Sequence, residues 1–149
     1  MGGAAEGRLP GAAAARAAPV SAVALDTNVY SAFMRGAPGA VAALRAASEI
    51  HLPLIALGEL LAGFAAGARA AKNREELAQF MASPRVSLLQ PDERTARHYA
   101  DIFVALRASG TPIPTNDLWI AALARQHRLA LLSLDSHFRA VPGLTVTSP

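Results

Sequence analysis

Several common features are missing from this chain of 149 residues, and each absence narrows its chemistry. There is no cysteine, which excludes disulfides, thiolate nucleophiles and cysteine-based zinc sites. The sequence also contains no Walker A motif, no G-x-G-x-x-G stretch and no G-x-S-x-G elbow, so the usual nucleotide-binding loops and the α/β-hydrolase nucleophile are not expected. The longest apolar stretch, near residues 50–68, is interrupted by Pro53 and Glu59. It is too short for a membrane span, and we expect a soluble protein.

Charged residues are sparse, at 17%, whereas hydrophobic residues make up 52% of the chain, a balance that predicts one globular domain with an easily filled core. Residues 1–20 are rich in alanine and glycine and lack apolar periodicity. Glu6, Arg8, Pro10 and Arg16 interrupt any continuous apolar region that a signal peptide would need. We therefore interpret residues 1–20 as a flexible tail or an over-long start, and residues 21–149 as the folded domain.

Short apolar strands alternate with helical patterns along the folded part, which predicts an α/β protein whose parallel sheet is covered on both faces. The helix expected at 92–109 has Ala96, Tyr99, Ala100, Phe103, Val104 and Leu106 mostly facing inward, and Trp119 is expected in the core. Strands are expected at 21–25, 50–54, 86–89, 129–132 and 144–147, and helices at 29–35, 40–48, 55–71, 72–81, 92–109, 115–126 and 136–139.

Four acidic residues occupy equivalent places in this alternation. Asp26 and Asp135 each follow an apolar strand, while Glu59 and Asp117 each lie near the start of a helix. Ligands of parallel α/β sheets bind beyond the carboxyl ends of the strands. We therefore expect the four carboxylates to converge on one edge of the sheet.

Each acid also has an ordinary structural explanation. Asp26 and Asp117 are suited to capping a helix N-terminus, and Asp135 to an Asx turn beside Ser133. Glu59 is harder to explain, because its neighbours are apolar and the nearest cation in sequence, Arg69, is ten residues away, beyond the reach of a local helical ion pair.

Clustered carboxylates repel one another unless a divalent cation neutralises them, and hard oxygen ligands favour Mg²⁺, Mn²⁺ or Ca²⁺ over zinc. Such a cluster suits phosphodiester hydrolysis with one or two Mg²⁺ or Mn²⁺ ions. The four histidines, His51, His98, His127 and His137, show no metal-ligand spacing. Thr27, Asn28, Asn116 and Ser133 either orient these ligands or cap helices.

The basic residues fit a polyanionic substrate. The chain has 14 Lys and Arg against 11 Asp and Glu, so setting aside the four clustered acids leaves 14 against 7. Thirteen of the 14 are arginine, which suits bidentate phosphate contacts, although genomic base composition explains the excess of arginine over lysine more simply.

Four segments resemble the motifs of PIN-domain ribonucleases in order and spacing. These are ALDTNV at 24–29, GELLAG at 58–63, IPTNDLWIAA at 113–122 and LSLDSHF at 132–138. The resemblance covers about residues 21–147 and is strongest to the VapC-type toxins of bacterial toxin–antitoxin pairs. Ser133 occupies a position where the family more often has threonine, which keeps the hydroxyl.

The resemblance implies a three-layer α/β/α sandwich with a mostly parallel central sheet, and a Mg²⁺-dependent cytoplasmic enzyme that cuts structured RNA. It also implies a homodimer and a small antitoxin protein as an inhibitory partner. By motif position the catalytic and metal-binding acids are Asp26, Glu59, Asp117 and Asp135.

Two alternatives stay open at this point. The first is an aspartyl-phosphate phosphatase or receiver-like domain, which also places an Asp after its first strand but needs a second acid near Asp26 and a catalytic lysine. The only lysine is Lys72, in an expected surface helix. The second is a catalytically silent PIN-like module that binds RNA or a protein partner.

Overall fold

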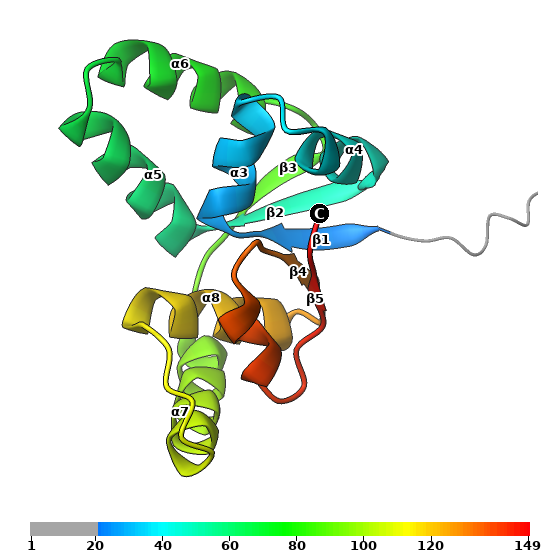
Figure 1. Ribbon diagram of the computed structural model, residues 1–149, viewed down its shortest axis with the longest axis vertical. Coiled ribbons are helices and arrows are strands. Elements are labelled where there is room, and N and C mark those ends of the chain that lie inside the picture. The colour runs from blue at the N-terminus through cyan, green and yellow to red at the C-terminus, as the bar shows by residue number, and fades with distance from the viewer. Residues whose placement is uncertain (1–20) are drawn as a thin grey trace, which may run out of the picture.

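The computed structural model describes residues 21–149, which form a sheet with helices on both sides (Figure 1). The predicted order of strands and helices is confirmed, whereas the interpretation of residues 1–20 as a tail lies outside the described residues. The elements are β1 (Ala22–Leu25), α3 (Thr27–Met34), α4 (Pro38–Ala46), β2 (Glu49–Pro53), α5 (Leu54–Ala66), α6 (Ala70–Met81), β3 (Val86–Leu89), α7 (Glu93–Ala108), α8 (Thr115–Gln126), β4 (Ala130–Leu132), η2 (Ser136–Ala140) and β5 (Val146–Thr147).

The sheet has the strand order β3-β2-β1-β4-β5, and every neighbouring pair is parallel. From β1 the chain moves outward through β2 to β3, and then returns to β4 on the other side of β1. Connections therefore leave β1 and β4 in opposite directions. A crevice opens at such a switch point, beyond the carboxyl ends of the two strands.

Helices α3 to α6 lie on one side of the sheet and α7 and α8 on the other (Figure 1). Because both faces are covered, the central strands carry apolar side chains facing both ways. Leu25, Ile50, Leu52 and Leu131 are at most 1% exposed. The three-layer α/β/α architecture expected from the resemblance is confirmed.

The face of α7 that packs inward differs from the prediction. Phe103 is 39% and Val104 65% exposed, and Ala96 and Ala100 are exposed too. The buried residues of α7 are Thr95, Ile102 and Leu106. Since α7 carries apolar residues on two faces, helical periodicity alone does not decide which face packs inward, and the packing against α8 decides it.

The prediction that Trp119 lies in the core is also wrong. It is half-buried and packs on Tyr99, with ring centroids 4.4 Å apart, so the two aromatic rings continue the exposed apolar face of α7. The helix predicted at 55–71 ends earlier, at Ala66, where the N–H of Gly67 donates to the carbonyl of Phe64. Across residues 21–149, no helix is long and apolar enough to cross a membrane.

Candidate active site

Asp26 lies at the switch point between β1 and β4. Its backbone N–H donates to the carbonyl of Leu132 over 3.0 Å, which continues the pairing of the two strands by one residue. Its Oδ1 accepts from the N–H of Thr27 at 2.8 Å, and its Oδ2 accepts from the hydroxyl of Ser133 at 2.7 Å. Asp26 is therefore the N-cap of α3, and it also lines the cavity described below.

The environment of Asp26 disfavours its negative charge. Only 3% of the residue is exposed, and burial raises its pKa to about 6, against an ordinary value of 3.8. The hydrogen bonds from Ser133 and Thr27 oppose this rise, whereas the nearby carboxylates of Asp117 and Asp135 add to it. A cation placed among these groups would stabilise the ionised form.

Glu59, on α5, is held by two neutral side chains from other helices. The hydroxyl of Thr27 donates to its Oε1 at 2.6 Å, and the amide of Asn116 donates to its Oε2 at 3.1 Å. The partner that this half-buried carboxylate needs is thus supplied by α3 and α8, not by a cation. The two bonds fix the direction in which the carboxylate points.

Asp117 lies in the first turn of α8, which begins after Pro114 without any side-chain cap. The predicted alternative, a capping role for Asp117, is therefore not what the structure shows. Burial raises the pKa of Asp117, the proximity of His137 opposes the rise, and the charges of Glu59 and Asp135 add to it.

Asp135 follows β4 in a turn that its own side chain does not cap. The turn is held instead by Ser133, whose Oγ accepts from the N–H of Asp135 at 3.0 Å, and by Asn28, whose Oδ1 accepts from the N–H of Leu134 at 3.2 Å. The Asx turn considered from sequence is replaced by a hydroxyl-held turn. The Asp135 carboxylate is consequently left exposed at the mouth of the crevice.

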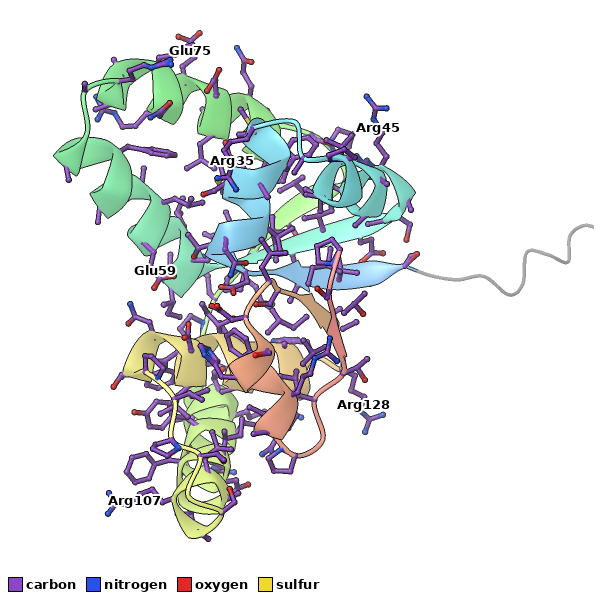
Figure 2. All side chains as sticks on the ribbon, viewed as in Figure 1. Arg35, Arg45, Glu59, Glu75, Arg107 and Arg128 are labelled. Atoms are coloured by element: carbon purple, nitrogen blue, oxygen red, sulfur yellow. The ribbon has the colours of Figure 1, made fainter. Side chains whose placement is uncertain are left out.

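All four predicted acids line one open cavity of about 770 Å³. Two further residues of the cavity wall, Ser31 and Arg35, were not singled out from sequence. In the view of Figure 2, Arg35 lies over α3 and Glu59 lies near the lower end of α5. The complete lining is Asp26, Thr27, Asn28, Ser31, Arg35, Glu59, Pro114, Thr115, Asn116, Asp117, Leu134 and Asp135.

The donor set fits a divalent cation. Among residues 21–149, Asp117, Asp135 and His137 each offer one ligand atom, and these atoms lie within 4.8 Å of one another. Asp26 and Glu59 line the same cavity without belonging to this tighter group. Carboxylate oxygens at this spacing suit Mg²⁺ or Mn²⁺.

The sequence gives no signal for His137, because histidine spacing indicates only ligands that share an ion from one segment. Its neighbour in the group, Asp117, is instead brought from α8, and the Nε2 atom of His137 lies 2.9 Å from the Oδ2 atom of Asp117. A contact between elements 20 residues apart in the chain leaves no spacing signal.

The lysine required by the aspartyl-phosphate alternative is not at the site. Lys72 lies on α6, its side chain is 63% exposed, and its ammonium is 3.7 Å from the carboxylate of Glu76. It is absent from the cavity wall that carries the four acids. The geometry therefore does not favour a phosphatase or receiver domain.

Comparison with known proteins agrees with this geometry. Residues 23–144 match the family model described as PIN domain. The chain is 35% identical over 100 residues to Ribonuclease VapC4 of Mycobacterium tuberculosis, a match that covers 66% of this chain and 75% of the relative.

Two solved structures show the same fold. VapBC-5 from Mycobacterium tuberculosis, a member of the VapBC family of toxin-antitoxin systems, matches with 28% identity and a TM-score of 0.64, covering 87% of this chain and 98% of that chain. VapBC2 from Rickettsia felis, bound to a DNA fragment from its promoter, matches with 22% identity and a TM-score of 0.78, covering 85% of this chain and 98% of that chain.

Proposed function

Since the chain belongs to the PIN-domain family, in its VapC branch, we propose that it is a metal-dependent endoribonuclease whose site is formed by Asp26, Glu59, Asp117 and Asp135. One observation carries this proposal. Acids from four separate elements line one cavity, and the most buried of them has a pKa raised to about 6. Gathering such groups without a compensating cation is unfavourable, which supports a site built to hold one.

Each side chain has a part that follows from its contacts. Asp117 and Asp135 would hold a Mg²⁺ or Mn²⁺ ion, with Asp26 at the back of the cavity and Glu59 at its side. An ion held there would supply Lewis acidity to the scissile phosphodiester and to the attacking water. Ser133 and Thr27 fix Asp26, and Thr27 and Asn116 fix Glu59, so the carboxylates are oriented before substrate arrives.

The substrate we propose is structured RNA. Arg35 is exposed on the wall of the acidic cavity, where its guanidinium can contact a phosphate beside the cleaved bond. The net basic remainder of the chain, 14 cations against 7 acids outside the site, favours a polyanion at longer range.

The test is cleavage of RNA by the purified chain. We expect cleavage with Mg²⁺ or Mn²⁺, none in excess EDTA, and recovery when the ion is added back. A chain that binds RNA with an undiminished affinity in EDTA, and never cuts it in either ion, would instead support the alternative of a catalytically silent binding module.

We also propose a small antitoxin protein as an inhibitory partner. A groove of about 210 Å³ between α3, α5 and α6 is lined by Tyr30, Met34 and Phe64 among others and adjoins the acidic cavity through Ser31 and Arg35. Met34, which lines the groove, is 40% exposed, and Phe64, which also lines it, is half-buried. Outside the groove lining, Leu61 on α5 is 39% exposed and Phe33 on α3 is half-buried, so part of the apolar surface of these two helices is open to a partner. An arginine of the partner could engage two site carboxylates at once.

Co-expression with the product of a small neighbouring gene tests the partner. We expect this chain alone to slow growth and cut RNA, and the pair to form a complex that does neither. Met34→Asp should weaken the complex, because it places a charge in the groove, whereas Ala108→Asp at the far end of α7 should not. If no product of a neighbouring gene binds this chain, the proposal of an inhibitory partner is wrong. The proposed cleavage chemistry would be unaffected by that result.

The family resemblance further implies a homodimer in the cytoplasm. Tyr99, Phe103, Val104 and Trp119 form an apolar face on α7 and α8. These two helices lie on the other side of the sheet from α3, α5 and α6 (Figure 1). We propose that a second copy covers this apolar face, which sedimentation velocity would report as the mass of two chains.

A further inference from the structure

The geometry points to His137 as a nitrogen ligand of the catalytic ion, one that makes the site bind Mn²⁺ in preference to Mg²⁺. This rests on the proposed function, because it concerns the ion of the same site. It adds an imidazole to a set that otherwise consists of carboxylate oxygens.

The distances between the side chains support this ligand role. The Nε2 atom of His137 lies 2.9 Å from the Oδ2 atom of Asp117, and both lie within 4.8 Å of a ligand atom of Asp135. Two ligands that each lie about 2.1 Å from one ion, at a right angle to each other, are about 3.0 Å apart. The separation of the His137 and Asp117 atoms is therefore short enough for both to bind one ion.

The orientation of the His137 ring also supports this ligand role. Although this distance is short enough for an ion pair, the Nε2 atom of His137 is buried and makes no directed hydrogen bond among the described residues. A buried ring nitrogen that contacts a carboxylate without an aligned hydrogen bond is uncommon. An ion between the ring and the two carboxylates would satisfy the nitrogen and the oxygens together.

The ring of His137 is held in place by its neighbours. His137 is the second residue of η2, and its neighbour Phe138 is fully buried, with the two ring centroids 4.7 Å apart. Phe138 fixes the turn on the core, while Ser133 fixes the backbone at Asp135 from the other end. Asp135 and His137 are thereby presented together from one short segment.

The chemistry of the ligand then sets the preference. Mg²⁺ binds oxygen ligands almost exclusively and keeps several waters, whereas first-row transition ions also accept imidazole nitrogen. An imidazole ligand that Mn²⁺ uses and Mg²⁺ does not should make the affinity of the site for Mn²⁺ higher than its affinity for Mg²⁺.

The experiment is metal binding by the full chain, with pulsed electron paramagnetic resonance on the Mn²⁺-loaded protein. We expect a coupling of Mn²⁺ to one imidazole ¹⁴N in the wild type. His137→Gln should remove that coupling and weaken Mn²⁺ binding about tenfold, while Mg²⁺ binding changes less than about threefold. His127→Gln, at an exposed position beyond α8, is the matched control and should keep the coupling.

The outcomes separate this inference from the proposed function. Mn²⁺ bound without any ¹⁴N coupling, or equal losses of Mn²⁺ and Mg²⁺ affinity in His137→Gln, would overturn the ligand role and leave His137 as a residue that only positions Asp117. RNA cleavage by the wild type would then still stand. Failure of the wild type to bind either ion would overturn both.

Discussion

Asp117→Asn should reduce metal-dependent RNA cleavage by at least about 100-fold, with the fold intact. Asp117 belongs to the group of three candidate ligands, with Asp135 and His137, whose ligand atoms lie within 4.8 Å of one another. The amide keeps the shape of the side chain in the first turn of α8, where no capping bond depends on it. What it removes is the negative charge that would hold the ion. The measurement is single-turnover cleavage of labelled RNA at saturating Mg²⁺, alongside circular dichroism.

The matched control is Glu75→Gln, which removes one negative charge from the exposed surface of α6. Glu75 points outward from this helix, away from the site (Figure 2). The Glu75→Gln variant should cleave RNA at the rate of the wild type. RNA binding should be retained by Asp117→Asn, because fewer acids then face the phosphates. Cleavage by Asp117→Asn within threefold of the wild type would rule out the metal mechanism at this cluster.

Much of the fold was predictable because its local signals agree. The helix predicted at 115–126 has those bounds in the structure, since Pro114 precedes it and an apolar stripe runs through Leu118 and Leu123. The strands were found as short apolar runs, which buried parallel strands require. The boundary between α5 and α6 was misplaced because alanine-rich sequence favours helix on both sides of Gly67, whose extended backbone ends α5.

The candidate site was predictable in its parts and not in its contacts. The four acids were found because each follows a strand or opens a helix. Their neighbours in sequence include four polar residues that make hydrogen bonds at the site, namely Thr27, Asn28, Asn116 and Ser133. Thr27 and Asn116 donate to Glu59 and Ser133 donates to Asp26, whereas Asn28 accepts from the N–H of Leu134. Arg35 and His137 were missed because their relation to the acids is purely spatial, across the cavity and across two elements.

Burial of Asp26 has a measurable consequence for stability when metal is withheld. The pKa of this carboxyl is about 6 in the folded chain, against 3.8 for an exposed aspartate. A carboxyl with a raised folded pKa binds protons more tightly in the folded state. Its contribution to stability is therefore complete below about pH 4 and is lost as the pH rises through about 6. A shift of this size corresponds to about 3 kcal/mol.

Asp26→Asn should accordingly raise the free energy of unfolding of the metal-free chain by about 3 kcal/mol at pH 8, and by much less at pH 4. The neutral amide has no charge to desolvate. Its oxygen can still accept from the N–H of Thr27, and its NH₂ group can donate to the hydroxyl of Ser133, which then accepts instead of donating. Urea denaturation in EDTA at the two pH values measures the difference, and Glu75→Gln should show none.

Adding Mg²⁺ at pH 8 should then stabilise the wild type more than Asp26→Asn, because the ion compensates the buried charge that the variant has lost. The gap between the two chains should narrow as Mg²⁺ is titrated. If Asp26→Asn were less stable than the wild type in EDTA at pH 8, the carboxylate would be contributing to the fold through its capping bonds more than its burial costs. Asp26 would then be chiefly the N-cap of α3, and the stability argument for a cation beside it would fail.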